Sequence, residues 1–158
     1  VHVIGYSMGA RIALSLALSH PERVARLVLS GNGWNMVESV GNWEPVRDAL
    51  LAPLLADVED PRGRAFRAFA EQTRSDRQAL AACAAGMRQP VVQAELQRVT
   101  APTLIAIGTL DEVAGSGERL AAALPRARFL PIPGRDHMRS VGDRAHIAGA
   151  VAFLREDA

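Results

Sequence analysis

A serine between two glycines, close to the start of the chain, constrains the fold more than any other feature. Residues 5–9 read Gly-Tyr-Ser-Met-Gly, directly after the apolar run 1–4 and before a helical pattern. A chain that turns from strand to helix in so few residues forces the residue at the turn into a strained conformation. We therefore expect Ser7 at the helix N-terminus, with Gly5 and Gly9 beside it because side chains there would collide with the neighbouring strand and helix.

The rest of the chain alternates strand-like runs with helical patterns. Apolar runs that suit strands occupy residues 26–30, 103–108 and 127–132. The run at 103–108 is apolar nearly throughout, which is typical of a strand buried on both faces. Pro131 and Pro133 place the last run near a sheet edge, because proline has no N–H to donate. This alternation predicts an α/β fold with a parallel sheet.

Two of the helical patterns carry an apolar stripe that predicts a buried face. The first covers residues 8–18 and ends at His20-Pro21, since proline cannot continue a helix. The second lies near the end of the chain, where apolar residues recur at intervals of four and three. The side chains expected to pack on the sheet are Ile12, Ala13, Leu16 and Ala17 in the first helix and Ile147, Val151 and Leu154 in the second.

Residues 31–98 differ from their surroundings, with two tryptophans, scattered prolines and short helical patches. Two patches begin where helices commonly begin, after Asp60-Pro61 and after Asp76. This pattern predicts an all-helical insertion between the two parts of one sheet domain, residues 1–30 and 99–158. Its large apolar side chains form either a plain core or the lining of an apolar pocket. They are Trp34, Met36, Trp43, Phe66, Phe69 and Met87.

The charged residues exclude several classes of function. The 18 basic and 17 acidic residues leave a formal charge of +1 without blocks of one sign, so we expect no nucleic-acid and no membrane partner. Every basic residue is an arginine. Schiff-base catalysis, pyridoxal-phosphate attachment and a phosphate-binding P-loop all need a lysine, and are excluded. A small molecule remains the expected partner.

The cysteine and histidine pattern predicts neither a metal site nor a cofactor. The single cysteine, Cys83, cannot form an internal disulfide, and its alanine-rich surroundings predict a small buried side chain. The four histidines lie far apart, without partners at the short spacings of metal sites. No apolar stretch approaches the ~20 residues of a membrane span, and no signal segment opens the chain, so we expect a cytoplasmic protein.

Two further residues follow strands at the edge where ligand chemistry gathers in parallel sheets. Asp111 comes three residues after the buried run 103–108, and His137 follows the last strand. Glu112 is the alternative to Asp111 as the acidic residue at this place. Asp136 is a poor partner for His137, because side chains adjacent in sequence rarely face each other. Structural roles within a strand, at a helix end and on the last helix suit the other histidines, which are His2, His20 and His146.

Three short runs carry a resemblance to a known family. They are residues 3–10 around the serine, His-Pro-Glu-Arg-Val at 20–24 and Leu-Val-Leu at 27–29. In these runs the chain resembles the C-terminal portion of α/β-hydrolase-fold serine hydrolases, in their esterase-like, cap-bearing branch. The resemblance covers residues 1–30 and 99–155, and the segment between them only as a helical cap.

The resemblance implies a catalytic triad in the chain order serine, acid, histidine. Ser7 would be the nucleophile, His137 the base, and Asp111 the acid, because its spacing from Gly108 matches the family pattern. The N–H of Met8 would be one oxyanion donor, whereas the family takes the other from the loop after its third strand, which is not in this chain. We therefore expect an upstream segment of the same enzyme, with a natural truncation as the alternative.

Such a triad implies a serine hydrolase that cleaves carboxylic esters or thioesters through an acyl-enzyme, without a cofactor. Relatives with the same triad and other chemistry are the first alternative: a C–C hydrolase, a cofactor-free haloperoxidase or an iminopeptidase. An inactive truncated remnant or a binding protein is the second.

Overall fold

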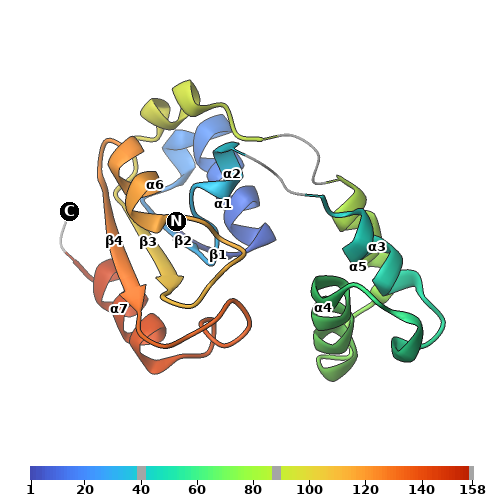
Figure 1. Cartoon of the computed structure of the whole chain (residues 1–158). Coiled ribbons are helices and arrows are strands. Elements are labelled where there is room, and N and C mark those ends of the chain that lie inside the picture. The colour runs from blue at the N-terminus through green and yellow to red at the C-terminus, as the bar shows by residue number, and fades with distance from the viewer. Residues whose placement is uncertain (39–41, 87–89, 157–158) are drawn as a thin grey trace. The chain divides into compact units, whose positions relative to one another are not determined.

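The computed structural model, which describes residues 1–38, 42–86 and 90–156, divides the chain into two compact units (Figure 1). The sheet unit combines Val1–Ser39 with Val91–Ala158, and the helical unit is Val40–Pro90. The helical unit is narrower than the predicted insertion of residues 31–98, because both ends of that range belong to the sheet unit.

The sheet unit is built on four parallel strands in the order β1-β2-β3-β4. The register places Gly5 beside Leu29, and Leu29 beside Ile105. The predicted α/β fold with a parallel sheet is confirmed, as is the edge position of the strand that carries Pro131. The strands are β1 (His2–Tyr6), β2 (Arg26–Ser30), β3 (Thr103–Gly108) and β4 (Ala127–Ile132).

Helices cover both faces of this sheet. Successive side chains of a strand point to opposite faces, so an apolar strand needs a packing partner on each face. Leu27 and Leu29 of β2 pack with α1 and α6 on one face, while Val28 packs with α7 on the other. The elements of the sheet unit outside the strands are α1 (Met8–Ser19), η1 (Pro21–Arg23), α2 (Asn35–Glu38), η3 (Gln93–Arg98), α6 (Gly117–Ala123) and α7 (Arg144–Leu154).

Helix α1 packs on the sheet through mostly small side chains. Its buried residues are Ala10, Ala13, Leu14 and Ala17. The prediction is therefore right for the two alanines and wrong for Ile12 and Leu16, which are 63% and 36% exposed. The close approach of helix and strand explains the difference, since a Cβ on Gly5 of β1 would lie 2.2 Å from the carbonyl oxygen of Gly9.

Helix α7 likewise turns a different face to the sheet than predicted. Its buried residues are His146, Ala150 and Phe153. Ile147 and Val151 are 52% and 40% exposed, so the predicted stripe is wrong for both. Here the Leu130 side chain of β4 packs against the helix backbone, since a Cβ on Gly149 would come within 2.3 Å of it.

Residues 42–86 of the helical unit form three helices and a short 3-10 turn. Both predicted helix starts are confirmed: an oxygen of Asp60 accepts a hydrogen bond from the Gly63 N–H at 2.6 Å, and Asp76 accepts two in the same way. Cys83 is exposed, so its predicted burial is wrong; α5 buries alanines instead. The elements are α3 (Glu44–Leu51), η2 (Leu55–Asp57), α4 (Pro61–Gln72) and α5 (Arg77–Gly86).

The large apolar residues of the predicted insertion divide between the two units. Trp34 and Met36 are buried in the core of the sheet unit. Trp43 and Phe66 pack edge to face in the helical unit, with ring centroids 5.4 Å apart. Phe69 is 38% exposed, and Met87 lies outside the described residues.

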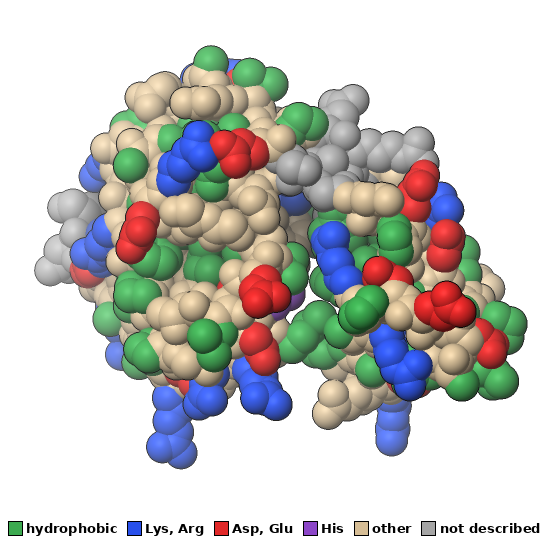
Figure 2. All heavy atoms as spheres, viewed as in Figure 1, with side chains coloured by type: hydrophobic (Ala, Val, Ile, Leu, Met, Phe, Trp, Pro, Cys, Tyr) green, Lys and Arg blue, Asp and Glu red, His purple; other side chains and the backbone are tan. Residues whose placement is uncertain are grey.

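On the surface, basic and acidic side chains lie among hydrophobic and neutral ones on the visible face of each unit (Figure 2). Within the part of the chain that the structure describes, no helix is both long enough and apolar enough to cross a membrane.

Candidate active site

Ser7 stands at the corner between β1 and α1 in a backbone conformation that non-glycine residues seldom adopt. Its φ is 52° and its ψ is −115°. The corner is held on both sides, because the Ser7 N–H donates to the Ser30 carbonyl at 2.8 Å and the Asn32 side-chain amide donates to the Ser7 carbonyl at 3.1 Å. Such strain persists only where the surroundings impose it, as these contacts do.

The two glycines near the serine differ in whether a side chain would fit in their place. Gly5 is required, since a Cβ there would lie 2.2 Å from the backbone of α1. At Gly9 a Cβ would meet nothing within 4 Å among the described residues, so the predicted collision is wrong. Gly9 is adjacent to Ala10, which faces the sheet, and one step along a helix turns the next position away from that face.

His137 lies between the other two predicted residues. Its Nε2 is 2.9 Å from the Ser7 Oγ, and its Nδ1 is 2.9 Å from the Asp111 Oδ2. The imidazole is 7% exposed and the Asp111 side chain is fully buried. A carboxylate only accepts hydrogen bonds, so Nδ1 carries the proton and the lone pair of Nε2 faces the serine hydroxyl.

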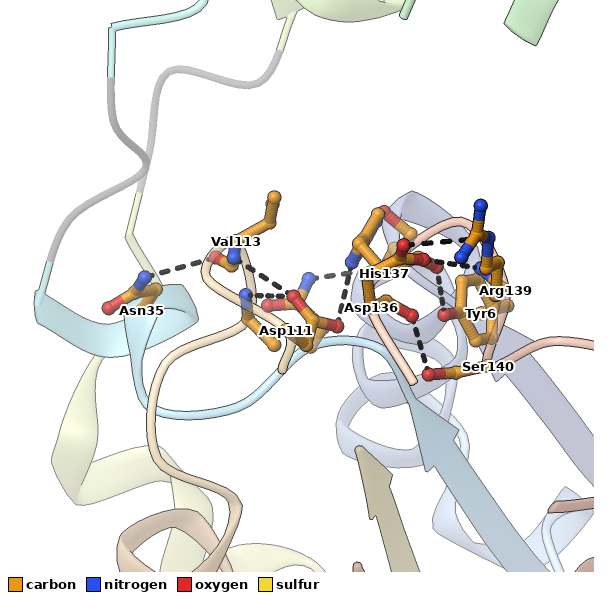
Figure 3. Close-up of polar contacts among 11 residues, drawn as sticks. Tyr6, Asn35, Asp111, Val113, Asp136, His137, Arg139 and Ser140 are labelled. Carbon is orange, nitrogen blue, oxygen red and sulfur yellow. Dashed lines mark hydrogen bonds and ion pairs between the residues drawn. The ribbon is translucent and has the colours of Figure 1, made fainter. Parts of the chain in front are cut away.

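Asp111 is oriented by its own turn. Its Oδ1 accepts hydrogen bonds from the N–H groups of Val113 and Ala114, both at 2.9 Å, which leaves Oδ2 for His137. The turn is tied to the segment after β2, because the Asn35 side chain donates to the Val113 carbonyl at 3.0 Å (Figure 3). Glu112, the competing acid, is exposed.

The loop that carries His137 is held by several bonds. The Tyr6 hydroxyl donates to the His137 carbonyl at 2.5 Å, and the Ser140 hydroxyl donates to the Asp136 carbonyl at 2.7 Å (Figure 3). The Asp136 carboxylate accepts from the Arg139 N–H at 2.8 Å and so serves the loop. Burial raises the pKa of Tyr6 to about 12, with a further contribution from the charge of Asp111.

Met8 is the first residue of α1, so its N–H has no acceptor within the helix. The N-terminus of a helix also carries the positive end of the macrodipole. Both features favour a negative charge that develops beside Ser7.

The remaining histidines lie outside this arrangement. His146 is buried, with Nε2 2.8 Å from the Ser30 Oγ and Nδ1 3.0 Å from the Val141 carbonyl. His2 and His20 are exposed. Over residues 1–38, 42–86 and 90–156, no three His, Cys, Asp or Glu side chains cluster as a metal site requires.

Three supporting residues escape the sequence reasoning: Tyr6, Asn32 and Asn35. The two asparagines follow the carboxyl end of β2, so the rule that located Asp111 could have found them. Tyr6 also lies at the carboxyl end of a strand, but nothing in the sequence identifies the His137 carbonyl as its partner.

The model of the α/β hydrolase fold family matches residues 1–82. The chain belongs to this family. The resemblance to the α/β hydrolases is therefore confirmed, and the four parallel strands with their helices are part of the α/β hydrolase fold.

Individual relatives agree with this assignment. The chain is 32% identical over 152 residues to 2-hydroxy-6-oxononadienedioate/2-hydroxy-6-oxononatrienedioate hydrolase 2 of Pseudomonas putida, a match over 80% of this chain and 52% of that protein. It is 28% identical to a hydrolase from Pseudomonas aeruginosa PA01, with a TM-score of 0.73 over 99% of this chain and 65% of that one.

An enol-lactonase from Burkholderia xenovorans LB400 shares the fold, with a TM-score of 0.78 and 22% identity over 99% of this chain and 66% of that one. The chain spans 52% and 59% of the length of two curated relatives that it matches.

Proposed function

We propose that the protein is a serine hydrolase that cleaves carboxylic esters or thioesters through a covalent acyl-enzyme. The observation that carries this proposal is the continuous line of contacts from Ser7 to His137 to Asp111, each of 2.9 Å, at a strained strand-to-helix corner. The contacts join a nucleophile to a base, and the base to a group that orients it.

In the first step, Ser7 Oγ attacks the carbonyl carbon of the substrate while Nε2 of His137 takes the hydroxyl proton. The imidazole becomes positively charged, and Asp111 stabilises it because its buried carboxylate faces Nδ1 at 2.9 Å. The tetrahedral intermediate collapses when His137 gives its proton to the leaving alcohol or thiol. Water then releases the acyl group by the same route in reverse.

The oxyanion of the intermediate needs hydrogen-bond donors. The Met8 N–H at the start of α1 is one such donor. We propose that an upstream segment of the same enzyme supplies the second donor, as the family resemblance implies, and that the helical unit is the family's cap.

Covalent labelling by a fluorophosphonate tests the proposal on the full-length protein. An activated serine oxygen attacks phosphorus and expels fluoride, whereas an ordinary serine does not react. We expect one adduct on Ser7, found by mass spectrometry of the peptide that contains it. Ser7→Ala should abolish labelling, and His137→Ala should reduce it by orders of magnitude. An unlabelled, folded protein would refute the proposal.

A second candidate is hydrolysis of a carbon–carbon bond by the same residues. The relative from Pseudomonas putida favours it, because that protein is named as the hydrolase of a 2-hydroxy-6-oxo dienedioate. The two candidates differ in substrate, so turnover should be compared on a short aryl ester and on a vinylogous 2-hydroxy-6-oxo acid. A kcat/KM that is higher on the ester by a hundredfold or more supports esterase activity, and the reverse ratio supports the second candidate.

A further inference from the structure

Tyr6, the residue before the serine, connects the nucleophile to the loop of the base. Its hydroxyl donates to the backbone carbonyl of His137 at 2.5 Å, and the two rings lie 5.6 Å apart at 48° (Figure 3). Tyr6 ends β1 and His137 follows β4, which are the two outer strands of the described sheet. The hydrogen bond therefore links segments from opposite sides of the sheet.

The phenol of Tyr6 is itself fixed in place. Gly31, with φ of 60°, leaves room for it, since a Cβ at that position would lie 2.6 Å from the ring. On another side the ring meets His146 edge-on, with centroids 6.1 Å apart at 71°. His146 is held in turn by Ser30 and by the Val141 carbonyl. A side chain with these neighbours can fix the position of the group to which it donates.

The position of the His137 main chain matters because the imidazole makes two directional contacts at once. Nε2 must face Ser7 while Nδ1 faces Asp111, both at 2.9 Å. A misplacement of reacting groups by 1 Å can cost about 10²-fold in rate. A shift of the His137 main chain would move the imidazole and so disturb both contacts together.

We propose that Tyr6 is a positioning residue for the reaction, whose hydroxyl fixes the main chain of His137 so that the imidazole meets both partners. The proposal rests on the proposed serine hydrolase function. Because burial raises the pKa of Tyr6 to about 12, the hydroxyl keeps its proton and remains a donor at any ordinary working pH.

Tyr6→Phe in the full-length protein removes the hydroxyl and keeps the ring. We expect kcat on an aryl ester to fall about tenfold, which is the size of one lost hydrogen bond, with KM changed less than twofold. The rate constant of fluorophosphonate labelling should fall by the same factor, because it reports on activation of Ser7. Unchanged kcat and labelling would overturn the proposal.

Thr103→Val is the matched control. It also removes a buried hydroxyl that donates to a backbone carbonyl, that of Ala101 at 2.9 Å. Thr103 begins β3, whereas the site lies at the carboxyl ends of the strands. We expect this variant to lose thermal stability without losing kcat. If it loses as much activity as Tyr6→Phe, the effect of Tyr6 is general destabilisation and the proposal is wrong.

Site-specific incorporation of difluorotyrosine at position 6 tests the proton itself, and keeps the proposal open to refutation even if Tyr6→Phe fails to fold. Fluorine lowers the pKa of the phenol, so the substituted enzyme should be active near neutral pH, where the phenol keeps its proton, and should lose activity at higher pH once the phenol ionises. The unmodified enzyme should lack this alkaline fall. Identical pH profiles for both enzymes would overturn the proposal.

The outcomes also separate this inference from the proposed function. If the unmodified protein is neither labelled nor active, the proposed function fails. If it is labelled and Tyr6→Phe is labelled at the same rate, the inference about Tyr6 fails alone.

Discussion

The sheet unit and the helical unit bury their interiors by different means. In the sheet unit, large aliphatic side chains from alternate strand positions form the core, and Leu27, Leu29 and Ile105 are fully buried. The buried cluster of the helical unit is small, and alanines make up half of it: its members are Val46, Leu50, Ala70 and Ala81.

The helical unit adds a buried arginine to this small core. Arg67 is 2% exposed and donates to the carbonyls of Ala49 and Ala52, at 2.9 and 2.6 Å, and to Glu71 at 2.7 Å. The two carbonyls lie at the C-terminal end of α3, where a helix leaves its last carbonyls without partners. The buried Arg67 therefore helps to hold α4 against the end of α3 through hydrogen bonds, whereas the sheet unit is held together by apolar burial.

The largest expected effect comes from removing the proposed catalytic side chains of the sheet unit. Ser7→Ala and His137→Ala should each lower ester turnover of the full-length protein by about 10⁴-fold or more. The double variant should be little worse than either single one, because the residues act as a unit. Steady-state kinetics of the three variants measure this. A double loss equal to the product of the single losses would contradict the triad.

Cys83→Ser in the helical unit is the control for this comparison. Its thiol is exposed and is the only one in the chain. We expect unchanged turnover and labelling. A large loss would show that the chemistry does not belong to the sheet unit alone.

The same contrast explains how far the sequence could predict the structure. The parallel α/β fold follows from strand patterns, and the positions of Ser7, Asp111 and His137 follow from the rule that sites gather at the carboxyl ends of parallel strands, together with the resemblance to the α/β hydrolases. The buried faces of α1 and α7 do not, because the points where helix and sheet approach most closely, at Gly5 and Gly149, decide which face turns inward.

Contacts between polar side chains and distant backbone are also invisible to such patterns. Arg67 looks like any surface arginine of a helix until the carbonyls of α3 are placed beside it. The hydrogen bond from Tyr6 to His137 is hidden for the same reason, since nothing local in either segment announces the partner.

A second prediction tests whether Arg67 is as important to its unit as we infer. Arg67→Met should destabilise the helical unit by about 2 kcal/mol, because the buried carbonyl of Ala49 loses its donor, whereas the Ala52 carbonyl keeps Arg77 as a donor at 3.2 Å. Hydrogen exchange should show faster opening of amides in α3 and α4, with β2 and β3 unchanged. Arg64→Met on the same helix removes an exposed arginine whose hydrogen bonds to the carbonyls of Leu55 and Val58 are longer, at 3.2 and 3.4 Å, and should have a smaller effect. Equal acceleration in both units would contradict the inference.

A smaller effect is expected from removing one helix cap in each unit. Asp60→Ala and Ser116→Ala each delete a side chain that accepts from a backbone N–H, that of Gly63 at 2.6 Å and that of Arg119 at 3.1 Å. A lost cap costs about 1 kcal/mol. Because the helical unit has the smaller core, we expect Asp60→Ala to open its own unit more than Ser116→Ala opens the sheet unit, as measured by hydrogen exchange. The opposite order would show that core size does not decide the response.

The smallest expected effect is a loss of stability at alkaline pH, which should differ between the two units. The pKa of Tyr6 is raised from 10.0 to about 12, so the folded sheet unit keeps a proton that the unfolded chain loses earlier. The contribution of Tyr6 to stability is therefore complete below pH 10 and is lost as the pH rises from 10 to 12. Because the phenol is only partly buried, we expect a small decline in stability.

The urea midpoint of the sheet unit should fall more steeply between pH 10 and pH 12 than that of the Tyr6→Phe variant. The helical unit, which has no tyrosine, should show no difference between the two proteins. Parallel curves for the sheet unit would mean that the phenol ionises equally in the folded and unfolded chains, and that its bond to His137 does not hold the proton.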